Sequence, residues 1–512
     1  MVREDVGVNL NSGGPPPTGL LIAGTSSDAG KSVIVAGLCR ALSRRGLRVA
    51  PFKAQNMSNN SMVCADGGEI GRAQWLQAAA AGVEPTTAMN PVLLKPGTDR
   101  RSFVVVRGRP AGVLEAGEYA AGRAHLRDAA FAAYRELADE YELVVCEGAG
   151  SPAEINLRAG DYVNLGLATE FGLPVVVVGD IDRGGILASL YGTWALLDDA
   201  DRALITAFVI NKFRGDVSVL EPGLEGITRR TGVPFRGVIP WLLDVWLDSE
   251  DTLAVGHWRA STASSPTAHG RLRIAVVRLP RISNATDVDA LAAEPGVDVL
   301  VTADPSVVEA ADLVVLPGSR STTSDLAWLR ERRLAGAVMA RAAAGRPVLG
   351  ICGGYQMLAH EIWDDVEGEV GHVPGLGLLP TRVEFGTEKV LGRPTGTWRG
   401  HHVDGAYEIH HGLAHPVADG GPGPEHFLDG WRSGSVWGTM WHGAFESDGF
   451  RRAWLSEIAA QADSDWRPAP DAPGFRERRE LMLDTLADAV DTHLDIDALL
   501  APTRAARKEL AR

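Results

Sequence analysis

The stretch LLIAGTSSDAGKS, residues 20–32, decides the fold of the first half of the chain. Its apolar start predicts a buried strand, and the residues after Lys31 continue in the apolar pattern of a helix. Between a strand and a helix, a glycine-rich lysine loop predicts phosphate binding, because the backbone amides at the helix start face an anion. The loop is one residue away from the ordinary pattern Gly-x4-Gly-Lys-Ser. The alternative, a chance Gly/Ser turn, leaves the two flanking elements unexplained.

The loop offers amides for phosphate oxygens, a lysine for the β and γ phosphates of a nucleotide and a serine hydroxyl for Mg²⁺. The nucleotide-binding residues that it predicts are Gly24, Thr25, Asp28, Gly30, Lys31 and Ser32. Asn211, in the segment INKFRGD after a later strand, is a further candidate that would recognise the nucleotide base. A turn or cap role is the alternative for Asn211.

Acidic residues end two further predicted strands. Glu147 ends the run LVVCE, and Asp180 ends the run VVVVGD. Parallel α/β sheets gather their chemistry at the carboxyl ends of the strands, and Mg²⁺ prefers oxygen ligands. We therefore expect Ser32, Glu147 and Asp180 to be metal ligands, although any single acid could equally be a helix cap or a solvated turn.

Outward from this stretch, strand-like apolar runs alternate with Ala- and Leu-rich helical stretches, and a second such series begins near residue 273. This alternation is typical of βαβ units, so the sequence predicts an α/β fold with two parallel-sheet domains. A Ser-, Thr- and Gly-rich segment without hydrophobic period separates them. The expected organisation is a flexible arm over 1–17, a first domain over 18–255, a linker over 256–272, a second domain over 273–455 and a C-terminal helical extension over 456–512.

The charge and composition of the chain exclude several classes of partner. A net charge of −15 argues against nucleic acid, because phosphate backbones require a basic surface. No apolar stretch reaches the ~20 residues of a membrane span, and the first residues lack the apolar core of a signal peptide. We therefore expect a cytoplasmic protein without membrane contact, while homo-oligomer formation stays open. The four cysteines are too scattered for a zinc site or a disulfide framework.

The stretch VLGICGGYQML, residues 348–358, places one of these cysteines between glycines after a strand. A nucleophile in a tight strand-to-helix turn is lifted clear of the sheet, and the next amide stabilises an oxyanion. Cys352 is therefore the predicted nucleophile, and the amide of Gly353 is one oxyanion donor. The segment LPGSRST provides Gly318, and the amide that follows it is the second predicted donor.

A thiol nucleophile needs a base. His442, in the segment GTMWHGAFE, is the candidate that we favour, and its competitors are His401, His402, His410 and His411.

Several further blocks follow one another along the chain: PFKAQNMSNNS, EGAGSPAEINL, GDIDRGG, PRISNATD, LPGSRST and YEIHHG. With the phosphate loop, the Cys352 elbow and the His442 segment, they resemble the blocks of the cobyric acid synthase family, in the same order, from Leu20 to about residue 455. This family of cobalamin-pathway amidotransferases joins a P-loop, dethiobiotin-synthetase-like ATP domain to a triad-type glutamine amidotransferase domain.

The resemblance implies that Cys352 and His442 hydrolyse glutamine through a thioester and release ammonia. It also implies that ATP with Mg²⁺ converts a corrinoid carboxylate to an acyl phosphate, from which ammonia displaces phosphate. In the family the product is adenosylcobyric acid, made from adenosylcobyrinic acid a,c-diamide by amidation of the b, d, e and g carboxylates. Triad amidotransferases carry a glutamate two residues after the histidine, where this chain has Ala444. The third member of the triad therefore stays open between Glu446, Glu408 and a simple dyad.

The block PFKAQNMSNNS, residues 51–61, follows the second predicted strand and is expected to face the substrate at the carboxyl edge of the sheet. A polar surface loop is the alternative. The substrate-binding residues that this block predicts are Lys53, Gln55, Asn56, Ser58 and Asn59.

Two other functions compete with this one. A cobyrinic acid a,c-diamide synthase would use the same chemistry on other carboxylates. A P-loop partition-type ATPase, from a different class, would leave the elbow cysteine and the second domain unexplained.

Overall fold

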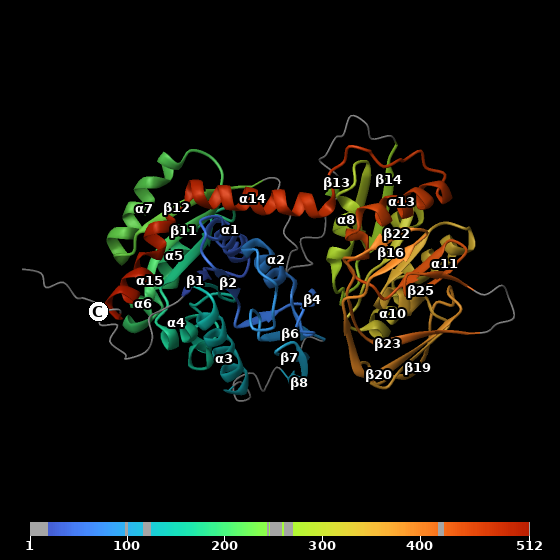
Figure 1. Ribbon diagram of the computed structural model, residues 1–512, viewed down its shortest axis with the longest axis horizontal. Coiled ribbons are helices and arrows are strands. Elements are labelled where there is room, and N and C mark those ends of the chain that lie inside the picture. The colour runs from blue at the N-terminus through green and yellow to red at the C-terminus, as the bar shows by residue number, and fades with distance from the viewer. Residues whose placement is uncertain are drawn as a thin grey trace, which may run out of the picture.

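The computed structural model describes residues 19–97, 101–115, 124–242, 245, 259–260, 270–417 and 424–510. The expected arm over 1–17 lies outside these residues, as does most of the expected linker. The described chain forms two α/β domains, one in the first half and one in the second (Figure 1). This confirms the predicted fold class of two domains built on parallel sheets.

The first domain is built on a six-stranded sheet in the order β12-β11-β10-β1-β9-β2, in which every neighbouring pair is parallel. Its strands are β1 (Gly19–Gly24), β2 (Val49–Phe52), β9 (Leu143–Glu147), β10 (Val175–Asp180), β11 (Ile205–Phe213) and β12 (Phe235–Pro240). The helices of this half are α1 (Lys31–Arg44), α2 (Arg72–Ala81), α3 (Ala124–Glu140), α4 (Leu165–Phe171), α5 (Ile186–Ala195), α6 (Asp199–Leu204) and α7 (Val217–Thr231), with a 3₁₀ turn η2 (Ile155–Gly160).

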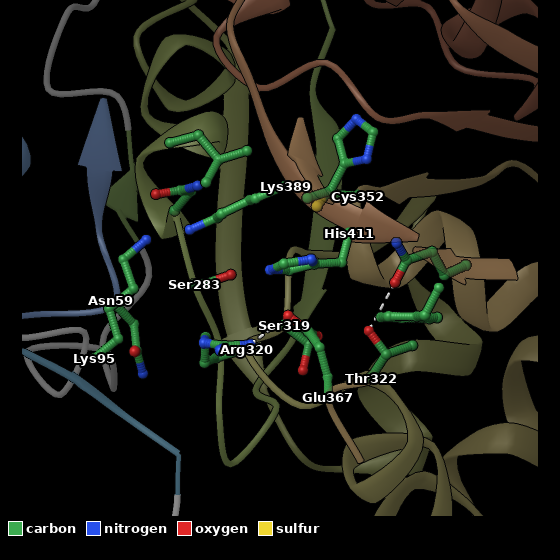
Figure 2. A pocket seen from close by; sticks show the side chains of 15 residues that line it. Asn59, Lys95, Ser283, Ser319, Arg320, Thr322, Cys352, Glu367, Lys389 and His411 are labelled. Carbon is green, nitrogen blue, oxygen red and sulfur yellow. Dashed lines mark hydrogen bonds and ion pairs between the residues drawn. The ribbon is translucent and has the colours of Figure 1, made fainter. Parts of the chain in front are cut away.

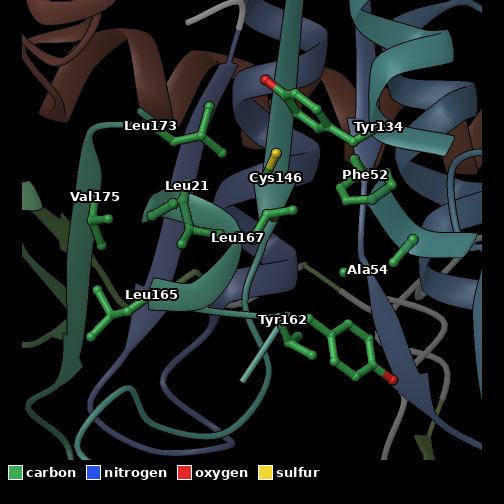
Figure 3. Packing of buried hydrophobic residues seen from close by; sticks show 14 of the residues in the cluster. Leu21, Phe52, Ala54, Tyr134, Cys146, Tyr162, Leu165, Leu167, Leu173 and Val175 are labelled. Carbon is green, nitrogen blue, oxygen red and sulfur yellow. The ribbon is translucent and has the colours of Figure 1, made fainter. Parts of the chain in front are cut away.

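The central strand β1 is buried on both faces, which explains its continuous apolar run. Leu21 and Ala23 belong to a core with Tyr134 of α3 and Leu165 of α4. Figure 3 shows Leu21, Tyr134 and Leu165 in this core. Because side chains alternate along a strand, Leu20 and Ile22 pack on the opposite face, against α1. The phosphate loop therefore begins at a strand that is fixed from both sides.

A smaller four-stranded sheet and a hairpin extend the first domain toward the second (Figure 1). The sheet has the order β3-β6-β7-β8. These strands are β3 (Gln55–Met57), β6 (Val92–Pro96), β7 (Arg101–Val106) and β8 (Arg109–Glu115), and the hairpin is β4 (Ser61–Val63) with β5 (Glu69–Gly71). The predicted substrate block runs along β3 and into β4.

The second domain is built on an eight-stranded sheet in the order β13-β15-β14-β16-β17-β26-β25-β24. The strands from β15 to β26 are parallel neighbours, and β13, β24 and β25 add antiparallel edges. The bounds are β13 (Arg259–Ala260), β14 (Leu272–Val277), β15 (Val297–Thr302), β16 (Leu313–Leu316), β17 (Val348–Ile351), β24 (Glu425–Phe427), β25 (Gly430–Ser433) and β26 (Val436–Thr439). The described part of the expected linker thus includes β13 and the first residue of β14.

Helices and a second antiparallel layer surround this sheet. The helices and 3₁₀ turns are η4 (Ala285–Val288), α8 (Asp289–Ala292), α9 (Pro305–Ala310), α10 (Thr322–Glu331), α11 (Leu334–Ala343), α12 (Gly353–Leu358), η5 (Ala444–Glu446) and α13 (Asp448–Gln461). The further strands are β18 (Glu361–Asp364), β19 (Gly371–Pro374), β20 (Thr381–Gly392), β21 (Gly396–Trp398), β22 (His401–Val403) and β23 (Glu408–Pro416). Helix α13 spans residue 455, at which the sequence suggests a domain boundary.

The chain returns to the first domain through α14 (Phe475–His493) and α15 (Ile496–Leu510). Figure 1 shows α14 crossing from the second domain to lie along α1. Phe475 is in the core of the second domain, whereas Met482, Leu486 and Val490 pack in the core around α1. One amphipathic helix therefore contributes to both domains.

Candidate active sites

The phosphate loop connects β1 to α1 and is held by its own lysine. Lys31 Nζ donates to the carbonyls of Ser26 at 2.8 Å and Ser27 at 3.0 Å, so the ammonium lies within the curl of the loop. Gly30 has φ 92°, a left-handed conformation that side chains rarely adopt. A Cβ on Gly30 would also lie 2.0 Å from Nδ2 of Asn211. A glycine is therefore required at this position for two independent reasons.

Asn211 lies beneath this loop, at the end of β11. Its Nδ2 donates to the carbonyl of Ala29 at 3.0 Å, and its side chain is buried. This hydrogen bond positions the loop backbone, and contact of Asn211 with a nucleotide base stays a prediction. Asp28 lies on the outer side of the loop, where its carboxylate pairs with Arg183 at 2.6 Å.

Glu147, at the carboxyl end of β9, lies at the centre of the site. Its Oε1 accepts from Ser32 Oγ at 2.8 Å and from Lys53 Nζ at 2.9 Å, and Gln77 of α2 donates to Oε2 at 2.5 Å. Burial raises the pKa of Glu147, but the charge of Lys53 and the hydrogen bonds from Lys53 and Gln77 hold it below its usual range. The structure thus brings together a predicted metal ligand, the loop serine and a predicted substrate residue.

The candidate metal ligands are oxygen donors, as Mg²⁺ requires. Asp180 is the third of them, and it pairs with Lys212 at 2.8 Å. Among the described residues, no group of three or more His, Cys, Asp or Glu side chains could hold a metal ion by itself. This donor set fits Mg²⁺, which typically uses one or two protein oxygens together with phosphates and water.

The predicted substrate residues other than Lys53 are largely occupied within the protein. Gln55 Oε1 accepts from Tyr162 at 2.5 Å, and Asn56 Nδ2 donates to Gln74 at 2.9 Å. Ser58 Oγ accepts the amide of Asn60 at 3.0 Å. Asn59 differs, because its Oδ1 is buried and has no hydrogen-bond partner in the described part of the chain. These contacts hold the loop, and direct substrate binding by its side chains stays a prediction.

Cys352 lies between β17 and α12 in a strained turn. Its backbone has φ 49° and ψ −109°, which is unusual for a residue with a side chain. A Cβ on Gly354 would lie 1.9 Å from the carbonyl of Leu316, and one on Gly353 would lie 2.7 Å from the amide nitrogen of Ser319. The glycines therefore allow the turn to press against the loop after β16. That loop contains Gly318, so both predicted oxyanion amides lie on neighbouring backbone segments.

His442 is buried beside this turn, and its partner is an acid that the sequence analysis missed. The Nδ1 atom of His442 lies 2.6 Å from Oδ2 of Asp287, and Oδ1 of the same carboxylate accepts the amide of Gly443 at 2.9 Å. Both side chains are buried. Burial lowers the pKa of His442, but the negative charges of Asp287 and Cys352 outweigh this and raise it to about 10. The structure thus assembles a Cys–His–Asp group.

The two acids considered earlier for the third position lie elsewhere. Glu446 pairs with Arg72 at 2.7 Å and with Arg479 at 2.9 Å, and so joins the domains. Glu408 lies 3.5 Å from His410. Asp287 belongs to the block PRISNATD, which the sequence analysis noted without giving its acid a role. The signal that could have identified Asp287 was its position in the segment after the predicted strand RIAVV, which is β14.

Two of the competing histidines, His410 and His411, line the same cavity as Cys352. His410 is buried, and His411 Nδ1 lies 3.1 Å from the carbonyl of Gly386. His401 and His402 are exposed on the short strand β22.

One cavity contains Cys352 and reaches across the domain boundary (Figure 2). Gln356 of α12, fixed by a 2.8 Å hydrogen bond from Thr322, also lines this cavity. Asn59 and Lys95 of the first domain lie on the other side. The thiol of one domain therefore faces the substrate block of the other.

Comparison with known proteins agrees with this two-domain arrangement. Residues 20–253 match the family model described as the CobQ/CobB/MinD/ParA nucleotide binding domain. Residues 273–450 match the CobB/CobQ-like glutamine amidotransferase domain. The second match removes the partition-type ATPase as an account of the whole chain.

Curated relatives match over nearly the full length. A cobyric acid synthase of Cutibacterium acnes is 63% identical over 487 residues, which is 94% of this chain and 99% of the relative. Cobyric acid synthases of Mycolicibacterium gilvum and Streptomyces avermitilis are 56% and 57% identical, each over 94% of this chain and 96% and 95% of the relative. The chain belongs to the cobyric acid synthase family, ATP-dependent amidating enzymes of cobalamin biosynthesis with a glutamine amidotransferase domain.

Proposed function

We propose that this chain amidates the b, d, e and g carboxylates of adenosylcobyrinic acid a,c-diamide to give adenosylcobyric acid, using ATP, Mg²⁺ and ammonia from glutamine. The observation that carries the proposal is the cavity that Cys352 shares with Asn59 and Lys95 of the nucleotide-binding domain. An ammonia-producing thiol facing a nucleotide domain supports transfer of ammonia to an activated carboxylate. A cytoplasmic location remains a prediction; in the part of the chain that the structure covers, no helix is long and apolar enough to cross a membrane.

In the glutaminase half of the reaction, the sulfur of Cys352 attacks the side-chain amide carbon of glutamine. The amides of Gly353 and of Ser319, which follows Gly318, donate to the oxyanion. The Nε2 atom of His442 gives its proton to the leaving ammonia and then takes one from the water that hydrolyses the thioester. In support, Asp287 occupies Nδ1, and a hydrogen bond with Cys352 is among the causes that raise the pKa of His442.

In the synthetase half, the amides around Gly24, Thr25 and Gly30 cradle the nucleotide phosphates, and Lys31 moves from the loop carbonyls to the β and γ phosphates. Ser32, Glu147 and Asp180 would hold Mg²⁺, which neutralises the phosphate charge. A corrinoid carboxylate attacks the γ-phosphorus and ADP leaves, and ammonia then attacks the acyl carbon and phosphate leaves.

The ion pair between Lys53 and Glu147 supports an exchange of partners in this half. With Glu147 as a ligand of the metal ion, the ammonium of Lys53 would be available to meet the acyl phosphate. The loop residues Gln55, Asn56, Ser58 and Asn59 would hold the polar side chains of the corrinoid.

The test uses purified protein with MgATP, adenosylcobyrinic acid a,c-diamide and glutamine labelled with ¹⁵N at its amide, followed by corrinoid mass. We expect four labelled amides from the wild type, and unlabelled amides from Cys352→Ala when ammonium is supplied. Amidation of cobyrinic acid at its a and c carboxylates instead would favour the a,c-diamide synthase. No corrinoid product at all would refute the proposal.

A further inference from the structure

The domain boundary holds a buried ionic cluster that the mechanism above does not use. Glu69 of β5 is fully buried and accepts hydrogen bonds from two lysines, Lys95 of β6 and Lys389 of β20. Ser61 completes the group: its Oγ donates to Glu69 at 3.0 Å and accepts from Lys95 Nζ at 2.9 Å. Glu69, Lys95 and Ser61 belong to the nucleotide-binding domain and Lys389 to the glutaminase domain, so the cluster closes across the boundary.

The charges in this cluster do not balance, because two ammonium groups share one carboxylate. Burial lowers the pKa of Lys95 to about 7; the charge of Glu69 opposes this, and the positive charges of Lys389 and Arg320 add to it. Burial raises the pKa of Glu69, but Lys389 and Lys95 hold it far below its usual range. Glu367, His410 and His411 are the remaining titratable groups of the cavity besides Cys352. Near neutral pH, Lys95 therefore exchanges a proton while Glu69 stays charged.

Lys95 lines the cavity that contains Cys352, which Figure 2 shows on the opposite side. The cavity has a volume of about 40 Å³, whereas a water-sized molecule needs about 10–15 Å³. Ammonia is of that size. Asn59 of the substrate block lines the same cavity as Lys95, and the amide of Ser58 donates to the carbonyl of Leu94, the residue before Lys95, at 3.0 Å. The amine thus lines the cavity that the source of ammonia shares with the loop that leads to Lys53 and Glu147.

We propose that the cluster of Glu69, Lys95 and Lys389 is a proton-exchange site for ammonia in transit, at which the uncharged amine of Lys95 takes a proton from ammonium. The nitrogen of ammonium keeps the electron pair of the broken N–H bond, and the proton bonds to Nζ of Lys95. Neutral ammonia continues to the acyl phosphate. Lys389, whose side chain is 12% exposed and reaches solvent, gives its own proton to water and takes up the proton of Lys95 through Glu69, so that the charge leaves the cluster.

The burial and the positive charges around Lys95 also disfavour the passage of ammonium through the cavity. Ammonium in the cavity meets the same burial and the same positive neighbours, Lys389 and Arg320, that disfavour a charged Lys95. Only neutral ammonia is a nucleophile, so the cluster would deliver the reactive form.

The inference rests on the proposed function, and the test separates the two. The full-length protein is given MgATP, the corrinoid diamide, ¹⁵N-amide glutamine and unlabelled ammonium at pH 6.5 to 8.5. The measured quantities are the ratio of glutamate released to amide formed and the ¹⁵N fraction of the new amides. The variants are Lys95→Met and Lys389→Met. The control is Arg393→Met, which removes an exposed ion pair to Glu84 across the same boundary.

We expect Lys95→Met to raise the ratio at least about threefold at pH 7 and to dilute the ¹⁵N label, whereas Arg393→Met leaves both at the wild-type values. Lys389→Met removes a positive charge that lowers the pKa of Lys95, so Lys95 should stay charged at pH 7 in this variant. The ratio of glutamate to amide should therefore be high at pH 7 and should fall to its low value at a higher pH than in the wild type. If Lys95→Met fails to fold, the pH profile of Lys389→Met decides.

An unchanged ratio in Lys95→Met, an equal rise in Arg393→Met or a Lys389→Met profile that does not shift would overturn the inference. A wild type that forms amides while these results fail would leave the proposed function intact. A wild type that forms no amide from either nitrogen source would overturn both.

Discussion

The carboxylate of Asp287 binds His442 twice, through the ring Nδ1 at 2.6 Å and through the amide that follows the histidine at 2.9 Å. One contact sets the orientation of the imidazole, and the other fixes the backbone that carries it. Because Nδ1 is occupied, the ring presents Nε2 to the cysteine, as a base for a thiol requires. We therefore propose that Asp287 is a positioning residue for the glutaminase.

Replacing Asp287 by asparagine should lower kcat for glutamine hydrolysis by up to about 10⁴-fold, the loss seen when asparagine replaces the aspartate that orients the histidine of a catalytic triad. The KM for glutamine should change little, because the glutamine pocket is not altered. Amidation from ammonium should persist. Glu408→Gln is the control, and an equal loss of glutaminase activity in that variant would contradict the assignment.

The raised pKa of His442 predicts a pH dependence of stability. An unfolded histidine titrates near 6.5, whereas His442 in the folded protein titrates at about 10. The folded state therefore binds the proton more tightly, so this contribution is full below pH 6.5 and is lost as the pH rises to about 10. Denaturation midpoints measured between pH 6.5 and 10 should fall more steeply in the wild type than in Asp287→Asn. Parallel slopes would show that the pair does not hold the proton.

Gly30→Ala should weaken ATP binding at least about tenfold, because a left-handed alanine is strained by about 1–2 kcal/mol and its Cβ meets Asn211. Adding Asn211→Gly removes the steric conflict but not the strain, so the double variant should recover part of the affinity. Gly232→Ala is a matched control, since Gly232 also has positive φ (+76°) but open space around it. The affinity for ATP is measured by nucleotide titration of Gly30→Ala, the double variant and Gly232→Ala. If the effects of Gly30→Ala and Asn211→Gly on this affinity simply add, the steric contact between the two residues is refuted.

Asp484 of α14 pairs with Arg40 at 2.8 Å and Arg44 at 2.7 Å of α1. Asp484→Asn should destabilise the protein by about 0.5–1 kcal/mol at low salt, the range of partly exposed ion pairs, and by less at 0.5 M salt. Thermal denaturation at two salt concentrations measures this. Glu225→Gln, which removes an exposed pair with Arg229 within α7, should have a smaller effect. A loss independent of salt would exclude an electrostatic origin.

Glu446 pairs with Arg72 of α2 and Arg479 of α14, two arginines that are almost fully buried. Removing one member of a buried ion pair leaves an uncompensated charge and typically costs about 3–5 kcal/mol. Glu446→Gln should therefore lower the denaturation midpoint much more than Asp484→Asn does. A comparable or smaller loss would mean that solvent reaches these arginines.

The features that could be predicted from the sequence are those that depend on residues close together in the chain. The phosphate loop and the Cys352 elbow were predictable because glycines, strand and helix lie within a dozen residues of each other. The family relatives and domain models confirm the resemblance and the fold class. The role of each site residue stays a prediction for experiment.

Asp287 was not predictable in the same way. It precedes His442 by 155 positions, and many acids along the chain have similar local surroundings. The rule that places the third member two residues after the histidine directed attention to the wrong part of the chain. The same reason hid the Glu69–Lys95–Lys389 cluster, whose members come from three strands of two domains.

The path of α14 has a consequence for the gene. Because this helix begins in the core of the glutaminase domain and covers α1 of the nucleotide-binding domain, the coding sequence cannot be divided at the interdomain segment into two self-sufficient halves. A front half made alone would expose the apolar surface that Met482, Leu486 and Val490 cover. Evolutionary fission, or a split reporter built on this enzyme, would have to supply the last two helices in trans.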